Sequence, residues 1–368
     1  MKLAGNDMLI QSLINEGVEY IFGYPGGAAL HIYDAIFNQK EMQHILVRHE
    51  QGATHAADGY ARATGKPGVV MVTSGPGATN AITGIATAFM DSIPMVVISG
   101  QVQSHLIGTD AFQETDMIGI SRPIVKHSFT VDHQSNIPRI VKEAFYVATS
   151  GRQGPVVIDV PKDLTNPDDL FDFNYPDEAN IRSYNPPIKP EENQIDRVIE
   201  ALKNSKRPVI YAGGGTIASN ASNELREFNS YIKAPVTNTL MGLGVYPGTD
   251  KYFLGMLGMH GTYQANMAMH NADLILAVGA RFDDRITNTP EKFAPRAQIV
   301  HFDVDHSSVS KIIEADIAVF GQVKDSLKSI NEKLKLESSY FNKDRFSDWH
   351  NQIANWKDAH GLNHDLYK

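Results

Sequence analysis

The chain has 368 residues, of which 42% are hydrophobic and 20% charged, so it has enough apolar residues for buried cores and is not a disordered chain. Its net charge of −9 disfavours a general nucleic-acid binder, and the lack of cysteine excludes disulfides, thiolate metal sites and cysteine nucleophiles. No stretch approaches the roughly 20 apolar residues of a membrane span, and the N-terminus has no signal-peptide core, so we expect a cytoplasmic protein without nucleic-acid or membrane partners.

The first 165 residues alternate between predicted helices and predicted strands. In chain order we expect a helix at 5–16, a strand at 20–22, a helix at 30–37, a strand at 44–47, a helix of small residues at 53–63, and strands at 68–73, 94–99 and 155–160. The last three strands are continuous apolar runs rich in β-branched residues, which is typical of strands buried on both faces of a parallel sheet. Residues 1–165 are therefore predicted to form an α/β domain.

Residues 166–190 are rich in Pro, Asp and Asn and show no periodicity, which predicts a linker. A second α/β domain is expected over residues 191–340. Its predicted elements are a helix at 193–204, a strand at 208–212, a helix at 220–232, strands at 234–238, 274–278, 298–302 and 317–320, and a helix at 325–336. In the tail, 341–368, two tryptophans and Ile353 recur at helical spacing, which predicts a packing or linker helix.

Glu50 lies between the predicted strand at 44–47 and the helix that follows it. Ligands of open α/β sheets bind beyond the carboxyl ends of the strands, so an acid at this place is a candidate catalytic residue. Small and apolar residues follow it, which favours a partly desolvated carboxyl that donates a proton. A carboxylate that only offsets the helix dipole explains the same pattern, and both interpretations stay open on these residues alone.

Three loops that contain glycine, hydroxyl or amide groups follow predicted strands, at residues 23–28, 73–80 and 108–116. Glycine permits a ligand to approach backbone N–H groups closely, and the hydroxyl and amide side chains supply hydrogen-bond donors. An ordinary turn or surface loop explains each pattern as well. The loops are therefore candidate ligand contacts.

Gly213, Gly215 and Ala218 match the glycine pattern of dinucleotide-binding sites, directly after the strand at 208–212. An ordinary NAD site also carries an acid at the end of the next strand. Here that strand ends in Asn238 and a threonine, which disfavours NAD.

Two later strands of the second domain also end in polar residues. Arg281 and Arg285 follow one of them and are suited to pair with a pyrophosphate. Asp303 and Asp305 follow the other and are suited to accept hydrogen bonds from ribose hydroxyls. This arrangement suggests a dinucleotide that lies across several strand ends.

Seven blocks of sequence resemble the large catalytic subunits of acetolactate synthase (acetohydroxyacid synthase), and in chain order they read YPGGA, RHEQGATHAADGYARATGKPGVVMVTSGPGATN, GTDAFQETD, SGRQGPVVIDVPKDL, GMHGTYQAN, GARFDDRIT and HFDVD. Parts of the second block are shared by many thiamine-diphosphate enzymes. FQETD, GMHG and RFDDR are more specific to the FAD-containing anabolic type. The resemblance extends from the first predicted helix to about residue 330.

The resemblance implies an α/β fold of two doubly wound parallel-sheet domains, one binding the pyrimidine of thiamine diphosphate and the other a Rossmann-like central domain binding FAD. It implies decarboxylation of pyruvate and carboligation to a second 2-oxo acid, pyruvate or 2-oxobutyrate, which is the first step of valine, leucine and isoleucine biosynthesis. In this family the residue matching Glu50 hydrogen-bonds the pyrimidine ring and favours the tautomer that activates the thiazolium carbon.

Three sets of site residues follow from the resemblance. Those expected at thiamine diphosphate are Pro25, Gly26, Gly27, Glu50, Asn80 and Gln113, with Glu50 catalytic. Those expected at FAD are Arg152, Gly213, Gly214, Gly215, Thr239, Leu240, Met241, Met259, His260, Gly279, Arg281, Asp283, Arg285, Asp303 and Val304. Those expected along the substrate channel are Ala28, Phe112, Gln113, Lys162 and Asp284.

The family also has a third domain, in which a Gly-Asp-Gly motif and a later Asn bind the diphosphate through Mg²⁺. No Gly-Asp-Gly occurs in this sequence, so we expect no metal site in this chain and expect a fragment that is inactive by itself. The family shares its active site between subunits, which implies a homodimer or a dimer of dimers, with a small regulatory subunit as a candidate partner.

Two alternatives remain at this stage. Another thiamine-diphosphate enzyme, such as glyoxylate carboligase or pyruvate oxidase, shares the general motifs, although RFDDR and FQETD argue against it. A non-catalytic flavin-binding module is favoured by the missing third domain.

Overall fold

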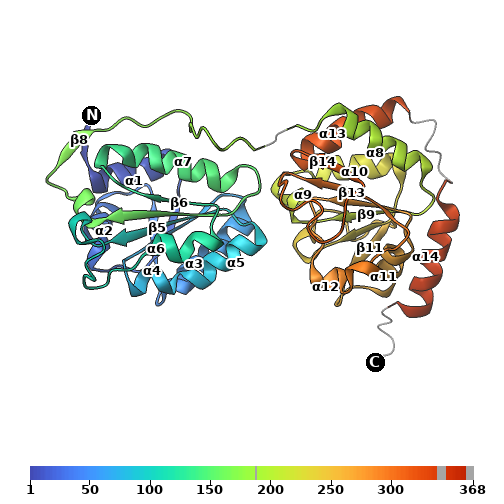
Figure 1. The fold of residues 1–368 in the computed structure, drawn as a ribbon, viewed down its shortest axis with the longest axis horizontal. Coiled ribbons are helices and arrows are strands. Elements are labelled where there is room, and N and C mark those ends of the chain that lie inside the picture. The colour runs from blue at the N-terminus through green and yellow to red at the C-terminus, as the bar shows by residue number, and fades with distance from the viewer. Residues whose placement is uncertain (187–188, 338–344, 362–368) are drawn as a thin grey trace. The chain divides into compact units, whose positions relative to one another are not determined.

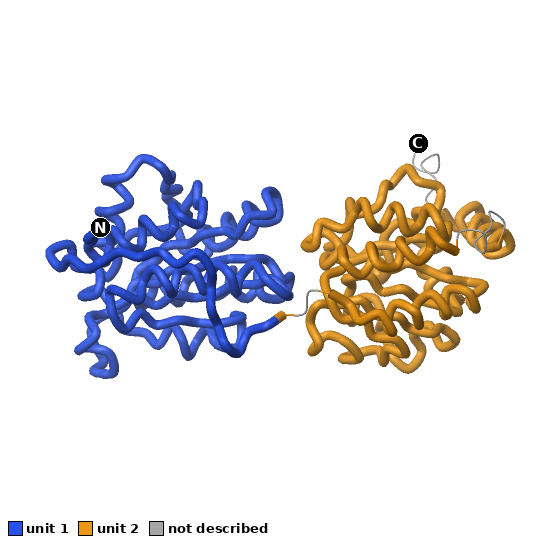
Figure 2. The backbone as a smooth tube through the Cα atoms, turned by 90° about the horizontal axis from the view of Figure 1, so that it is seen from above, with its two compact units in different colours: residues 1–185 blue, residues 186–368 orange. Residues whose placement is uncertain are grey.

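The structure is a computed structural model that describes residues 1–186, 189–337 and 345–361. The chain divides into two compact units, Met1–Asn185 and Pro186–Lys368, which are coloured separately in Figure 2. Each unit contains a six-stranded sheet in which every described strand pair is parallel. The predicted fold class, two doubly wound parallel α/β domains, is confirmed. No helix in the described parts of the chain combines the length and apolar character that a membrane crossing requires.

The sheet of unit 1 has its longest strands in the middle. Across the sheet the strands are β3 (Gln43–Leu46), β2 (Tyr20–Gly23), β4 (Gly68–Val72), β5 (Met95–Gln101), β7 (Pro155–Pro161) and β6 (His127–Thr130). Every residue of β4, β5 and β7 is buried. Alternate residues of a strand point to opposite faces, so Val69 and Met71 join one hydrophobic core while Val70 and Val72 join another. The continuous apolar runs in the sequence therefore reflect burial on both faces.

Helices cover both faces of this sheet. One core is completed by α1 (Gly5–Asn15), α2 (Leu30–Asn38) and α7 (Ile137–Thr149), and the other by α3 (Glu50–Thr64), α4 (Pro76–Asn80), α5 (Ile82–Asp91) and α6 (Met117–Ser121). Figure 1 shows α1 and α7 on one side and α3 and α5 on the other. At Gly84 of α5 a Cβ would lie 1.9 Å from the Thr54 hydroxyl oxygen of α3, so the two helices cross at a distance that only glycine permits.

The segment predicted as a linker contains one short strand. β8 (Leu170–Asp172) pairs antiparallel with β1 (Lys2–Ala4) at the N-terminus. Further along, the Tyr175 hydroxyl donates to Glu16 Oε1 at 2.5 Å, and Lys126 Nζ donates to the Tyr184 hydroxyl at 2.8 Å. Strand pairing and side-chain hydrogen bonds thus hold the segment at 170–184 against unit 1.

Unit 2 repeats the same layered arrangement. Across its sheet the strands are β11 (Phe253–Met256), β10 (Val236–Asn238), β9 (Pro208–Ala212), β12 (Leu274–Val278), β13 (Gln298–Asp303) and β14 (Ile317–Phe320). Its helices are α8 (Glu192–Asn204), α9 (Gly214–Ala218), α10 (Ser222–Ile232), α11 (Tyr263–Asn271), α12 (Asp284–Thr287), α13 (Val323–Leu336) and α14 (Ser347–His360). The predicted end of this domain at residue 340 lies outside the described residues.

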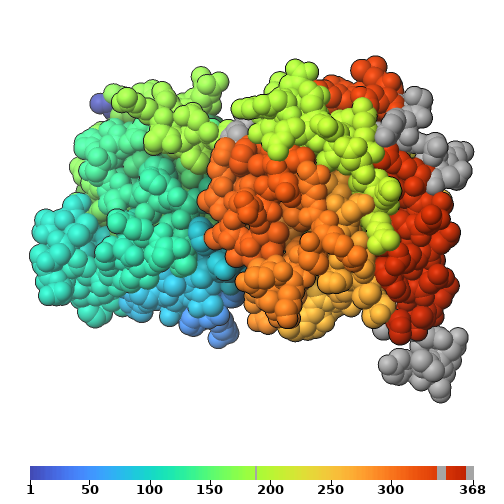
Figure 3. Space-filling model, turned by 45° about the vertical axis from the view of Figure 1, so that its right-hand side comes forward, coloured from blue at the N-terminus to red at the C-terminus, as the bar shows by residue number. Residues whose placement is uncertain are grey.

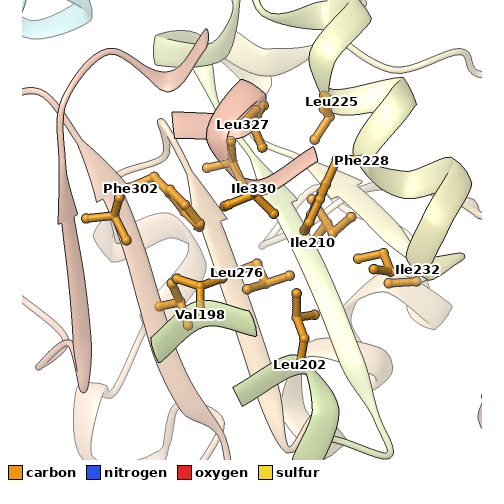
Figure 4. Packing of buried hydrophobic residues seen from close by; sticks show 14 of the residues in the cluster. Val198, Leu202, Ile210, Leu225, Phe228, Ile232, Leu276, Phe302, Leu327 and Ile330 are labelled. Atoms are coloured by element: carbon orange, nitrogen blue, oxygen red, sulfur yellow. The ribbon is translucent and has the colours of Figure 1, made fainter. Parts of the chain in front are cut away.

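The two faces of the second sheet have separate cores. On one face, α8, α10 and α13 pack on the strands, and Figure 4 shows Phe228 of α10 and Leu327 of α13 directed toward Ile210 and Phe302 of the sheet. On the other face lie α11 and α14. The predicted tail helix is the packing helix α14, a red column on the surface in Figure 3. Its Trp349 is buried and donates from Nε1 to the Pro208 carbonyl oxygen at 3.1 Å.

Candidate functional site

The loops singled out in the first half of the sequence all leave the same edge of the sheet. Because the six strands of unit 1 are parallel, their carboxyl ends share one edge, and the loops after β2, β3, β4, β5 and β7 start there. This edge is where open α/β sheets bind ligands.

Glu50 is the first residue of α3, three residues earlier than the predicted helix start at Ala53. The helix begins there because the ring of His49 caps it, with Nδ1 accepting from the backbone N–H of Gln51 at 3.2 Å. Glu50 is only 8% exposed, and Asn80 Nδ2 donates to its Oε2 at 2.9 Å. The structure therefore brings the two predicted cofactor residues together and fixes one oxygen of the carboxyl group.

Glycines keep space open around this carboxyl group. A Cβ on Gly77 would lie 3.4 Å from Glu50 Oε1 and 2.6 Å from Thr73 Cγ2, and a Cβ on Gly26 would lie 2.4 Å from Thr73 Cγ2. The Thr73 hydroxyl also accepts from the backbone N–H of Ala28 at 3.2 Å. Thr73 thus joins the loop after β2 to the loop after β4, a role that its place in the TSGPGATN block alone does not reveal.

Tyr33 is a site neighbour that the sequence analysis missed. Its hydroxyl donates to the carbonyl oxygen of Met71 at 2.9 Å. Burial, and then the charge of Glu50, raise the pKa of the Tyr33 hydroxyl, which keeps it a protonated donor. Its only signal in the sequence is a place on the helix at 30–37, which any core aromatic would share.

The loop between β5 and α6 carries Phe112 and Gln113. Glu114 accepts hydrogen bonds from the backbone N–H groups of Gly108 and, at 3.0 Å, of Ala111, and these bonds lower the pKa of its carboxyl group. Gln113 has a φ of 59°, and a Cβ on Gly75 would lie 2.7 Å from its carbonyl oxygen. Gln113 is thereby placed against the loop after β4.

Phe112 is 88% exposed, an apolar side chain held in solvent beside that loop. On the neighbouring turn after β7, Lys162 is half-buried. That turn is tied to the loop after β5, because the backbone N–H and the hydroxyl of Ser104 both donate to the Asp163 carboxylate at 2.8 Å. The predicted channel residues of unit 1 therefore lie on loops that are connected to one another.

In unit 2, three of the predicted FAD glycines, Gly213, Gly214 and Gly215, are closely packed. A Cβ on Gly213 would lie 2.3 Å from the Gly279 carbonyl oxygen, and a Cβ on Gly214 would lie 3.1 Å from Met241 Cβ. The backbone N–H of Gly215 donates to the carbonyl oxygen of Gly279 at 2.9 Å. The turns after β9 and β12 thus touch backbone to backbone, which leaves no room for a side chain at Gly213 or Gly215.

Apolar side chains are exposed around the same strand ends. Leu240 is 69% and Met259 is 66% exposed. Thr239 caps the turn at 240–242 by accepting from the N–H of Gly242 at 2.9 Å, and the N–H of Met259 donates to the Arg285 carbonyl oxygen at 3.0 Å. Exposed apolar side chains on a fixed backbone suit a flat apolar ring.

The predicted charged residues lie at the starts of two turns. Asp283 caps α12 by accepting from the backbone N–H of Arg285 at 3.1 Å, and this bond with the nearby Arg281 and Arg285 charges lowers the pKa of its carboxyl group. Asp284 is 79% and Arg285 70% exposed. Asp303 Oδ1 accepts from the N–H of Asp305 at 2.8 Å, so its carboxylate shapes the turn after β13.

The remaining predicted FAD contacts are less informative. His260 is exposed and Val304 is half-buried. Arg152 belongs to unit 1, where its Nε donates to the Ser92 hydroxyl at 2.8 Å, and its contact with FAD stays a prediction. Two open hollows, of about 530 and 460 Å³, contain no predicted site residue. In the described part of the chain no three His, Asp or Glu side chains group as metal ligands.

Comparisons with known proteins match a segment of each unit to a family of enzymes. Residues 3–120 match the family model described as the thiamine pyrophosphate enzyme N-terminal TPP binding domain, and residues 195–330 match the thiamine pyrophosphate enzyme central domain. The acetolactate synthase large subunit of Buchnera aphidicola subsp. Acyrthosiphon pisum is 57% identical over 363 residues, which are 99% of this chain and 63% of the relative.

Two further relatives show the same coverage. The acetolactate synthase large subunit of Haemophilus influenzae is 55% identical over 97% of this chain and 62% of its own length. The acetolactate synthase isozyme 3 large subunit of Escherichia coli K12 is 53% identical over 99% of this chain and 64% of its own length. The chain therefore spans a little less than two thirds of the relatives that it matches.

Proposed function

Since the chain belongs to the family of acetolactate synthase large subunits, we propose that it provides the pyrimidine-binding and flavin-binding domains of an acetolactate synthase. The reaction is decarboxylation of pyruvate and transfer of the two-carbon unit to a second 2-oxo acid, pyruvate or 2-oxobutyrate. The observation that carries the proposal is the hydrogen bond between the buried Glu50 and the half-buried Asn80 at the strand ends of a domain matched as TPP binding. The matches favour this function over glyoxylate carboligase, pyruvate oxidase or a non-catalytic flavin-binding module.

Thiamine diphosphate, when bound, supplies a nucleophilic ring carbon and the sink for the electrons released with carbon dioxide. In this chain, Glu50 would hold and move a proton at its carboxyl group, facing the aminopyrimidine. Asn80 donates a hydrogen bond to Oε2 of Glu50, and the absence of a side chain on Gly77 leaves room beside Oε1. Pro25, Gly26 and Gly27 would line the same side of the ring.

The loop after β5 would then complete the substrate side of the site. Gln113, held against Gly75, would donate from its side-chain amide to an oxygen of the bound 2-oxo acid. The exposed ring of Phe112 would exclude water from it. Ala28, Lys162 and Asp284 are the other proposed channel residues.

The function can be tested with a chimera in which the portion of the Haemophilus influenzae relative beyond its matched region follows this chain. We expect acetolactate from pyruvate when thiamine diphosphate, Mg²⁺ and FAD are present, measured by a colorimetric product assay. Acetate or tartronate semialdehyde as the product would refute this proposal and support pyruvate oxidase or glyoxylate carboligase.

FAD is proposed to lie across the strand ends of unit 2. The exposed Leu240 and Met259 side chains suit its ring system, and the Arg281 and Arg285 guanidinium groups suit its pyrophosphate. No residue of this site is assigned a redox role.

We expect this chain to retain flavin absorbance through gel filtration after incubation with FAD. Reversing one charge, in Arg281→Glu, should weaken FAD binding by about tenfold or more, because a charge-assisted contact is lost and a repulsive one is added. Arg226→Glu, on the exposed face of α10, is the matched control and should leave the dissociation constant unchanged. Equal weakening by both variants, or no flavin retained by the unaltered chain, would refute the assignment.

Membership of this family also supports proposals about protein partners, metal and location. The relatives are called large subunits, which supports a small regulatory subunit as a partner. We also propose a homodimer or a dimer of dimers, Mg²⁺ ligands outside this chain, and a cytoplasmic location.

A further inference from the structure

We propose that Asp159 is a positioning residue for the loop at 104–116: through the side-chain amide of Gln101, its buried carboxyl group fixes the backbone that presents Phe112 and Gln113. The inference rests on the proposed function only for the meaning of that loop as the substrate side of the site. The contacts themselves stand without it.

Asp159 occupies a place where an acid is unfavourable for packing alone. It lies on β7, paired with Ser99 on β5 and with Thr130 on β6, and is only 4% exposed. Burying a carboxyl group costs free energy unless hydrogen bonds compensate. One oxygen of this group, Oδ1, has no hydrogen-bond partner among the described residues. A role beyond packing would account for an acid here.

The other carboxyl oxygen begins a chain of hydrogen bonds to the loop. Gln101 Nε2 donates to Asp159 Oδ2 at 3.1 Å and also to the Thr115 carbonyl oxygen at 2.8 Å. Gln101 Oε1 accepts from the backbone N–H of Val102 at 2.8 Å. Both ends of the amide are therefore held, and its orientation is fixed.

Three consecutive residues anchor the loop, each in a different way. Gln113 rests on Gly75, Glu114 binds backbone N–H groups within the loop, and Thr115 is held by Gln101. The first two anchors lie within the loops, whereas the third reaches the buried sheet. Loss of the Asp159–Gln101 link should therefore loosen Phe112 and Gln113 and leave the sheet intact.

The Asp159 carboxyl group is mostly protonated at pH values below its raised pKa of about 7. Burial, with a smaller contribution from the charge of Asp116 on the adjoining turn, raises the pKa of Asp159 to about 7, against the opposing hydrogen bond from Gln101. A neutral acid and an asparagine offer the same acceptor oxygen. Asp159→Asn should therefore preserve the link, while Asp159→Leu removes it.

The test is hydrogen–deuterium exchange of the 368-residue chain at pH 6, read on peptides covering residues 104–116 and on β4. We expect Asp159→Leu to speed exchange in the loop by about fivefold, as for the loss of one hydrogen bond near 1 kcal/mol, with β4 unchanged. Asp159→Asn should stay within twofold of the unaltered chain. Glu143→Gln, at another buried acid on α7, is the control and should change neither peptide.

A second variant covers the case in which Asp159→Leu fails to fold and β4 also loses protection. Gln101→Met keeps the length of the side chain and removes its three hydrogen bonds, to Asp159, Thr115 and Val102, so it should also speed loop exchange. In the chimera, both variants should raise the KM for pyruvate more than they lower kcat. Loop exchange within twofold of normal in both variants would overturn the inference. Because exchange needs neither cofactor nor turnover, this result is independent of whether the proposed function holds.

Discussion

Glu50→Gln should lower kcat for acetolactate formation by about 100-fold to 10,000-fold in the chimera described above, the range for loss of a positioned proton-transfer group. Glutamine has nearly the same shape, and its side-chain oxygen can still accept from Asn80, which donates to Oε2 at 2.9 Å in the native site. What it loses is the ability to take up and return a proton. The kcat is measured at saturating pyruvate and thiamine diphosphate.

The fold and the flavin should be unaffected by this change. Glu50 belongs to unit 1 and the proposed flavin residues, apart from Arg152, belong to unit 2, so FAD absorbance should be normal in the same preparation. Glu143→Gln, at a residue with 6% exposure similar to the 8% of Glu50, is the matched control and should keep near-normal turnover. If Glu50→Gln turned over within threefold of the unaltered enzyme, Glu50 would have no part in proton transfer.

The core strands were predictable because strands that are buried on both faces consist mainly of apolar residues. β4, β5, β7, β9 and β12 are buried throughout, and each contains a continuous apolar run. β6 and β11 lie at the edges of their sheets and mix exposed or half-buried residues, so the same criterion passed over them. α7 was missed although its buried Ile137, Ile140, Val141, Ala144 and Phe145 have helical spacing.

The candidate site was predictable only where its residues are neighbours in a motif. Glu50 and the glycine loops could be predicted because ligands of parallel sheets bind beyond the carboxyl ends of the strands. Thr73, Tyr33 and Asp159 matter through contacts across the fold. The Asp159–Gln101 bond, for instance, depends on the register that pairs Ser99 with Asp159. No property of either strand alone fixes that register.

The aromatic residues of the segment at 166–190 also make contacts across the fold that the local sequence does not predict. Pro, Asp and Asn suggested a linker, but Phe171 and Phe173 pack against the core of unit 1, and Tyr175 binds Glu16 at the end of α1. Such contacts depend on where α1 and α7 end, which composition does not record.

Gly213→Ala should destabilise unit 2 by about 1–3 kcal/mol or more, as expected when atoms are forced into a packed backbone. The added Cβ would lie 2.3 Å from the Gly279 carbonyl oxygen and 2.6 Å from Ala280 Cα. Both are backbone atoms of the turn that follows β12, and they cannot rotate away as a side chain could. Urea unfolding followed by tryptophan fluorescence measures the effect, because both tryptophans of the chain, Trp349 and Trp356, lie in α14 of unit 2.

Gly248→Ala is the matched control for that experiment. A Cβ there would meet only one atom, Phe253 Cε1, at 3.9 Å, so its free energy of unfolding should change by about 0.5 kcal/mol or less. If Gly213→Ala were as stable as this control, the turns after β9 and β12 would be free to separate. The glycine at 213 would then be required for the approach of a ligand and not for packing. Gel filtration with FAD decides between these causes, because a packing defect lowers stability even without FAD, whereas a ligand requirement lowers flavin retention alone.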